Sequence, residues 1–330
     1  MQQHSDESDL FIGVDGGQST TLTVLADGQG SIMSSAVTGP CNHIHEPGGL
    51  ERQYRALRQG YDAVFAGIGR PVGRVRGVYL GLTGSGHKPT VESVYEADSI
   101  TVASDLITAL SGAIPDMQGV IVIAGTGSAA YGQNPDGRTA VAGGHGFYAG
   151  DEGSAADIAR LAFRAVFQSK DGRGPSTTLT RRLLDYYDCA DLPAMRKRIY
   201  GDLSRDQLAK AAGVVGQAAA EDGDAVAISL LEHAGLELGR LVAASLRQLD
   251  WLDSPVPVAP IGGVFHNGSL VTTPMIAHIH QTNPAAFMQA PRFQPVIGAL
   301  LLAYRTVGIP VTPTIVENLD RTRHHFVAKN

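Results

Sequence analysis

Two acidic residues that end apolar or strand-like segments have the type and setting for phosphoryl-transfer chemistry. Asp15 ends the segment FIGVD, and Asp105 stands in TVASDLITAL, where a strand-like run gives way to an Ala- and Leu-rich run. A carboxylate at such a junction can accept the proton of an attacking hydroxyl group. It can also hold Mg²⁺, which prefers carboxylate, water and phosphate oxygens. For Asp105, a plain helix N-cap is the alternative.

The glycines after the first of these acids predict a hairpin tip that holds phosphate. In the P-loop and the dinucleotide fingerprint, the glycines open a helix. Here the run 21–25 alternates polar and apolar residues, which is typical of a strand. Gly16 and Gly17 would bring backbone N–H groups close to an anion, and Ser19 and Thr20 would add hydroxyl donors. The alternative is a plain type I′ hairpin with its glycines at positive φ.

The same plan recurs about 110 residues later. Residues 120–139 again give an apolar strand, a Gly-x-Ser/Thr turn, a short strand and a DG turn. Thr126, Gly127 and Ser128 lie at the tip of this second hairpin. A repeat at this distance predicts a duplicated domain. Two such tips could hold one polyphosphate.

Two further motifs contain candidate polar ligands. GDEGSAA contains Asp151 and Glu152 just before a predicted helix, where capping of N–H groups is the alternative role. PCNHIH contains Asn42 and His43 in a predicted polar turn, and an ordinary Asn turn is the alternative there. The Cys-x-His-x-His pattern in that stretch lacks a second ligand cluster, so we do not predict a metal site of this type.

Strands and helices must position these residues. The predicted strands of the first half are 11–14, 20–26, 32–38, 75–82 and 120–124, and apolar residues three to four apart predict a helix over 49–69. The second half is richer in helix, with predicted helices over 153–169, 206–220, 223–250 and 295–307 and a short strand over 256–263. Ser154, with Asp157 three residues later, has capping-box spacing.

Composition limits the class of protein. The 330 residues carry a net charge of −6 and no basic run, which argues against nucleic acid or an anionic membrane as the main partner. Only two cysteines occur, Cys41 and Cys189, so neither a disulfide framework nor an iron–sulfur site is expected. The first ten residues are unlike a secretory signal, and no apolar run approaches the roughly 20 residues of a membrane span. We therefore expect a cytoplasmic protein.

In order and spacing, these motifs resemble a known family. The two hairpins and the segment IGGVFHNG at 261–268 resemble the phosphate and adenosine motifs of the actin/Hsp70/sugar-kinase superfamily. CNHI at 41–44, GTGS at 125–128 and GGHGFYAGDEGSAADIA at 143–159 resemble, more narrowly, the BadF/BadG/BcrA/BcrD ATPase family and, within it, the N-acetylglucosamine kinases. GTGS followed at this distance by GDEGSA is the most specific part of the resemblance.

The resemblance implies an α/β fold with two actin-like (ribonuclease H-like) lobes around a nucleotide and sugar cleft. We expect a disordered tail over 1–10, an N-terminal lobe over 11–119 and a C-terminal lobe over 120–294. The last stretch, 295–330, would consist of a helix that returns to the first lobe and a tail.

The activity that the resemblance implies is phosphorylation of the 6-hydroxyl group of an amino sugar by ATP and Mg²⁺, with N-acetylglucosamine foremost, in a homodimer. Glucosamine, N-acetylmuramic acid and other hexoses are alternative substrates. Outside this class, an ATPase that activates a dehydratase and a non-catalytic sugar sensor are alternatives.

The resemblance also implies roles for individual residues. Asp105 would be the catalytic base and would contact the sugar, and Asp15 would hold Mg²⁺. The other sugar ligands would be Asn42, His43, Gly144, His145, Gly146 and Asp151, with Ala155 packed nearby. The nucleotide would bind Gly16, Gly17, Ser19, Thr20, Thr126, Gly127, Ser128, Gly262, Gly263 and Asn267. His145 departs from the family pattern, because many relatives carry an aromatic residue there.

Overall fold

Two five-stranded sheets, each with its own helices, divide the chain into two units. A computed structural model describes residues 9–17, 20–41, 44–68, 74–84, 87–201 and 203–323. Unit 1 consists of residues 1–117 and 291–330, and unit 2 of residues 118–290. Of the tail expected over 1–10, residues 1–8 lie outside the described residues, whereas Asp9 is buried and pairs with Arg76.

Unit 1 is built on a mixed sheet with the strand order β3-β2-β1-β4-β5. Its strands are β1 (Leu10–Gly16), β2 (Thr21–Asp27), β3 (Ile32–Thr38), β4 (Val75–Leu82) and β5 (Ser99–Ser104). Its helices are α1 (Gly49–Ala66), α2 (Lys88–Glu92), α3 (Asp105–Ala113), α11 (Pro295–Thr306) and α12 (Pro313–Thr322). β1, β2 and β3 run antiparallel, whereas β1, β4 and β5 are parallel, so the carboxyl ends of these last three strands meet at one end of the sheet.

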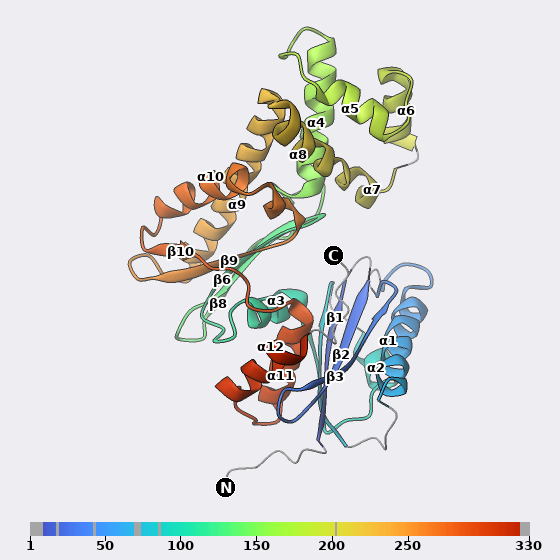
Figure 1. Ribbon diagram of the computed structural model, residues 1–330, viewed down its shortest axis with the longest axis vertical. Helices are drawn as coiled ribbons and strands as arrows, with labels where there is room; N and C mark the ends of the chain where they lie inside the picture. The colour runs from blue at the N-terminus through green and yellow to red at the C-terminus, as the bar shows by residue number, and fades with distance from the viewer. Residues whose placement is uncertain are drawn as a thin grey trace. The chain divides into compact units, whose positions relative to one another are not determined.

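Alternating side chains of the central strands bury both faces of this sheet. Phe11 and Val24 belong to the core formed with α11 and α12, and Ile12 and Leu25 belong to the core formed with α1. This is the period of two that an extended strand imposes on its side chains. Accordingly, α1 and α2 lie on one side of the sheet and α3, α11 and α12 on the other (Figure 1).

Helix α11 brings the late part of the chain against β1. Its residues 296–304 are all buried, as the apolar run predicts. Gly13 of β1 allows this close approach, because a Cβ there would lie 2.6 Å from the Val296 carbonyl oxygen. Likewise, a Cβ on Gly298 would overlap the carbonyl oxygen of Thr108, so α11 and α3 pack backbone against backbone.

Unit 2 is built on a sheet with the strand order β10-β9-β6-β7-β8. Its strands are β6 (Gly119–Ala124), β7 (Ser128–Gln133), β8 (Thr139–Gly143), β9 (Val256–Ile261) and β10 (Ala286–Met288). Its helices are α4 (Ala155–Lys170), α5 (Leu179–Tyr186), α6 (Leu192–Gly201), α7 (Arg205–Ala209), α8 (Ala211–Asp222), α9 (Ala225–Gln248) and α10 (Ser269–His280), with a 3₁₀ helix η1 (Gly263–Asn267). Helix α9 packs on β6, β7 and β8, and it also contacts α8 and α10.

The two sheets share one plan. In each sheet three consecutive strands are antiparallel, β1–β2–β3 in unit 1 and β6–β7–β8 in unit 2. The first of the three pairs on its other side with a parallel strand, β4 or β9, which in turn pairs with a further parallel strand, β5 or β10. The repeated segments 11–30 and 120–139 correspond to β1–β2 and β6–β7, which hold the same place in their sheets. The repeated pattern in the sequence therefore corresponds to a repeated arrangement of strands.

The helices differ in detail from the sequence pattern. The single helix predicted over 206–220 is wrong: α7 and α8 are separate, and the Gly213 N–H donates to the Lys210 carbonyl at 3.1 Å, an i→i+3 bond of a tighter turn. Helix α1 ends at Ala66, earlier than predicted. Helices α5, α6, α10 and α12 were not among the predicted elements.

Within the described residues, no helix is both long enough and apolar enough to cross a membrane.

Candidate active site

The carboxyl ends of β1, β4 and β5 bring acidic and hydroxyl side chains together in unit 1. Thr83, just after β4, donates its hydroxyl hydrogen to Asp105 Oδ2 at 2.6 Å. Ser104 caps α3, because its hydroxyl oxygen accepts a hydrogen bond from the Leu106 N–H at 3.3 Å. Asp105 is therefore not the N-cap, and the alternative role considered for it is wrong. Its carboxylate is half-buried and held in place by Thr83.

Asp15 lies near Asp105 at the same end of the sheet. Burial and, to a lesser extent, the neighbouring charge of Asp105 raise the pKa of Asp15 to about 7. A carboxylate in this setting is costly to ionise unless a cation compensates it. The pair of Asp15 and Asp105 thus has the charge pattern of a site for a divalent cation bound together with phosphate.

The glycine after Asp15 is required by packing and not by turn geometry. Gly16 is still part of β1 and pairs with Thr21, and it does not have a positive φ. A Cβ on Gly16 would overlap the Sγ atom of Cys41. Gly16 therefore does not have the positive φ that the type I′ alternative gave to the glycines, and the central residues of the turn, 18 and 19, lie outside the described residues. Gly17 begins the loop and donates its N–H to the Thr20 carbonyl at 2.9 Å.

Three predicted ligands lie outside the described residues: Ser19, Asn42 and His43. Their roles stay predictions. The chain next to two of them is described, because Cys41 is buried and Gln53 of α1 donates to its carbonyl oxygen at 3.4 Å.

In unit 2, the tip of the β6–β7 hairpin is a three-residue turn. Ala124 pairs with Ser128, and the Gly125 N–H donates to the Gly127 carbonyl at 3.0 Å. The turn is tied to the start of α4, because the Ala155 N–H donates to the Gly125 carbonyl at 2.9 Å. The Ser128 hydroxyl donates to the Glu152 carbonyl at 2.7 Å. The structure thus brings Thr126, Gly127 and Ser128 together with the GDEGSAA motif.

Asp151 contacts this hairpin directly. It is 4% exposed, and its φ of 62° lies in the left-handed region, which non-glycine residues seldom occupy. Its Oδ1 accepts a hydrogen bond from the Ser128 N–H at 3.2 Å, and its Oδ2 forms an ion pair with Arg205 of α7. Asp151 therefore links the hairpin tip to an arginine that the sequence analysis did not single out. Its role as a sugar ligand stays a prediction.

The loop between β8 and Asp151 contains the other predicted sugar contacts. Gly144 and Gly146 have φ values of 74° and 83°, a conformation that favours glycine. The Gly144 N–H donates to the Ser128 carbonyl at 2.9 Å, so the loop starts beside the hairpin. His145 is exposed. The sugar contacts assigned to this loop stay predictions.

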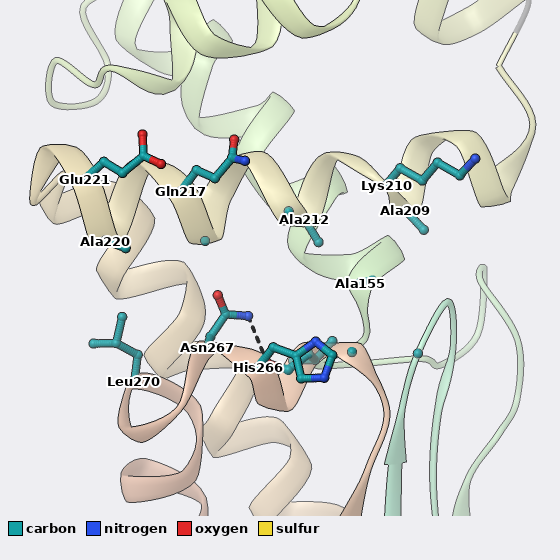
Figure 2. Close-up of a pocket in the computed structure, with 15 residues that line it drawn as sticks. Ala155, Ala209, Lys210, Ala212, Gln217, Ala220, Glu221, His266, Asn267 and Leu270 are labelled. Atoms are coloured by element: carbon teal, nitrogen blue, oxygen red, sulfur yellow. Dashed lines mark hydrogen bonds between the residues drawn. The ribbon is translucent and has the colours of Figure 1, made fainter. Parts of the chain in front are cut away.

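A pocket of about 570 Å³ opens in unit 2 between α8 and η1 (Figure 2). Gly263 and Asn267, which were predicted from the adenosine motif, line it with Gly125 of the hairpin. Gly262 has a φ of 115° and lies against the end of β6, where a Cβ would overlap the Ala124 carbonyl oxygen. The volume is that of a small-molecule site. Ala155, expected near the sugar, lines this pocket.

Small residues form most of the helix wall of this pocket. Ala209, Ala212, Gly213, Gly216 and Ala220 line it, and Figure 2 shows Ala209, Ala212 and Ala220 on the side of α7 and α8 that faces η1. Asn267 is fixed there because its side-chain N–H donates to the Val264 carbonyl at 2.8 Å. A flat, largely apolar group could therefore lie between the helix and η1.

Comparison with known proteins identifies the chain. The model of the BadF/BadG/BcrA/BcrD ATPase family matches residues 12–303. The chain belongs to this family. The resemblance inferred from the motifs is therefore confirmed, and so is the two-lobed α/β fold that it implied.

Relatives match most of the chain. One is the N-acetylmuramic acid/N-acetylglucosamine kinase of Clostridium acetobutylicum, 30% identical over 264 residues that cover 78% of this chain and 85% of the relative. The N-acetyl-D-glucosamine kinase of Dictyostelium discoideum is 26% identical over 313 residues, covering 89% and 98%. A crystal structure of a candidate N-acetylglucosamine kinase from Chromobacterium violaceum has a TM-score of 0.73 and 30% identity, and the match covers 89% of this chain and 98% of that one.

Proposed function

We propose that this protein transfers the γ-phosphoryl group of ATP to an amino sugar, and that the 6-hydroxyl group of N-acetylglucosamine is the acceptor. The observation that carries the proposal is the similarity, over 78–89% of this chain, to relatives whose names all include N-acetylglucosamine kinase activity. Glucosamine, N-acetylmuramic acid and other hexoses are the alternative acceptors. We also propose that the protein is a cytoplasmic homodimer, as the resemblance of its motifs to the family implies.

Asp105 is the proposed general base. As the sugar oxygen bonds to the γ-phosphorus, the hydroxyl proton passes to the Asp105 carboxylate, and the bond from that phosphorus to the oxygen that leaves with ADP breaks. The hydrogen bonds from Thr83 to Oδ2 at 2.6 Å and from the Ser104 hydroxyl to Oδ1 at 3.3 Å support this assignment, because they hold the carboxylate in place. A fixed base lowers the entropic cost of reaching the reactive geometry.

Asp15 is the proposed ligand of Mg²⁺. Its half-buried carboxyl group lies beside a second carboxylate, so a cation would relieve the repulsion between them. The described residues contain no cluster of three metal-ligating side chains. This fits Mg²⁺, which commonly takes one or two protein carboxylates and completes its shell with water and phosphate. When bound, Mg²⁺ would neutralise phosphate charge.

The β6–β7 hairpin and the pocket next to it are the proposed nucleotide site. N–H groups at the hairpin tip would bind phosphate oxygens, and adenine would lie between α8 and η1.

Two alternatives from other classes are less well supported. Cys41 is 1% exposed, so a dehydratase activator would have only Cys189 to offer a cluster. A silent sugar sensor would bind ATP without turnover.

Replacing Gly213 by leucine should weaken nucleotide binding. Gly213 lines the pocket and has open space where a Cβ would lie, so the larger side chain fills the pocket without distorting α8. Overpacking of this kind costs about 1–3 kcal/mol, so the KM for ATP should rise about 10-fold or more. The KM for the sugar should stay near its original value.

Gly213→Ala is the matched control, because it makes the same change to the helix backbone with a side chain too small to fill the pocket. Steady-state kinetics with each substrate varied in turn provide the measurement. An equal rise of the KM for ATP in both variants, or none in Gly213→Leu, would argue against the pocket as the nucleotide site.

The proposed function is tested by ADP release with MgATP and a panel of sugars: N-acetylglucosamine, glucosamine, N-acetylmuramic acid, N-acetylmannosamine and glucose. We expect strong turnover with N-acetylglucosamine. Strong turnover with another aminated hexose alone would keep the kinase and change its substrate. No ADP release with any of the five sugars, while ATP still binds, would contradict the proposal and favour the non-catalytic sugar sensor.

A further inference from the structure

The β6–β7 hairpin tip is bordered by an arginine that no motif of the family resemblance includes. Arg205 is the first residue of α7, and Ser204 and Gln207 hold that helix start with a reciprocal capping box. A Cβ on Gly127 would lie 2.9 Å from Arg205 Nη2 and 2.7 Å from Asp151 Oδ1. The guanidinium group and the carboxylate therefore lie directly over the hairpin tip.

Asp151 alone would make this tip a poor place for a polyphosphate. Its carboxylate is buried and already accepts the Ser128 N–H, so an incoming phosphate would meet a like charge. The ion pair with Arg205 offsets that charge. A buried acid that faces an anion site needs such a partner, because unpaired buried charge is costly.

Arg205 retains donors that Asp151 does not use. Among the described contacts, Nη2 pairs with Asp151, whereas Nε is buried without a hydrogen-bond partner. The side chain is 31% exposed, and its guanidinium carbon lies 6.0 Å from the centre of the Phe147 ring. A guanidinium group has five N–H donors in a planar fork, and such a fork suits phosphate oxygens.

We propose that Arg205 is a ligand of the nucleotide phosphates, and that Asp151 is the residue that positions it. This inference rests on the proposed nucleotide site at the β6–β7 hairpin. The guanidinium group would donate to a phosphate oxygen held by the N–H groups of the tip, while Nη2 stays paired with Asp151. Arg205 would thus add a positive charge beside a hairpin tip whose own N–H donors are neutral.

The test measures the affinities of the full chain for MgATP, ADP, AMP and adenosine by calorimetry, for the unmodified protein and for Arg205→Gln and Arg205→Lys. A hydrogen bond to a charged group contributes about 10-fold or more to affinity, so Arg205→Gln should weaken ATP binding about 10- to 100-fold. Adenosine binding should change by less than about twofold, because the base pocket does not use this charge. Arg205→Lys should recover part of the loss.

Arg240→Gln is the control, because Arg240 of α9 also pairs with an acid, Glu237, but its side chain is exposed and is not among the residues that line the pocket. An equal loss of ATP and adenosine affinity in Arg205→Gln would show a purely structural ion pair and overturn the inference. So would unchanged affinity for all four ligands. If the unmodified chain binds ATP but phosphorylates no sugar, the proposed function fails while this test still stands; if it binds no adenine nucleotide, both fail.

Discussion

Replacing Asp105 by asparagine should lower kcat by on the order of 10² or more while leaving the affinities for ATP and sugar nearly unchanged. Asparagine has the same shape and can still accept the Thr83 hydrogen bond, but it cannot take up a proton. A positioned general base contributes typically 10²–10⁴-fold to rate, so the loss should be confined to the chemical step. Steady-state kinetics and calorimetric binding of each substrate are the measurements.

The control is Asp62→Asn. Asp62 is an exposed acid of α1 in the same unit and pairs with Arg58 across one helical turn. Exposed pairs of this kind contribute little, so its kcat should stay near the original value. The assignment of Asp105 fails if Asp105→Asn turns over at a normal rate, or if it loses sugar and ATP affinity as strongly as it loses kcat.

Replacing Asp15 by asparagine should lower kcat/KM by about 10²-fold and raise the Mg²⁺ concentration that gives half-maximal activity. The amide has no charge to hold the cation, and the phosphates would lose part of their neutralisation. Titrating activity with Mg²⁺ at fixed ATP measures this, with Asp62→Asn again as the control. A variant that keeps the original Mg²⁺ dependence would show that Asp15 is not the ligand.

The same substitution should stabilise the metal-free protein at high pH. The pKa of Asp15 in the folded state is about 7, above its ordinary value, so the folded state keeps a proton that the unfolded chain has already released. The free energy of unfolding therefore falls as the pH rises from about 4 to about 7 and stays low above that range. Asparagine escapes this cost because it cannot ionise.

Thermal unfolding in a metal chelator tests the linkage. The Tm of Asp15→Asn minus that of the unmodified protein should be larger at about pH 9 than at about pH 5. A difference that is the same at both values would mean that Asp15 titrates normally. Catalysis and stability thus make opposite demands on this carboxyl group, as is common at functional sites.

The sequence was most informative where one local pattern sets the structure. The apolar run at 11–14 and the alternation over 21–25 predicted the two hairpin strands, and the apolar run after Pro295 predicted the buried helix α11. The DGG motif predicted a loop between two strands, but it did not predict that Gly16 packs closely against Cys41. Glycine suits both a close packing contact and a close approach to a ligand, so the motif alone does not reveal the packing contact.

Contacts between distant segments were not predictable in this way. Thr83 bonds to Asp105 across 22 residues, and Arg205 pairs with Asp151 across 54. Nothing near Arg205 in the sequence marks it, because its role depends on where α7 starts relative to the hairpin. For Thr83, its place just after a buried strand was a usable signal, since ligands gather at the carboxyl ends of parallel strands.

The most direct test of the central claim is phosphorus NMR of the product formed from MgATP and N-acetylglucosamine. We predict a new phosphomonoester signal split by the two protons of C6, formed in step with ADP and formed on the order of 10² times more slowly with Asp105→Asn. A signal split by the single anomeric proton would contradict the proposed 6-hydroxyl acceptor. Inorganic phosphate as the sole product would contradict the proposed transfer itself.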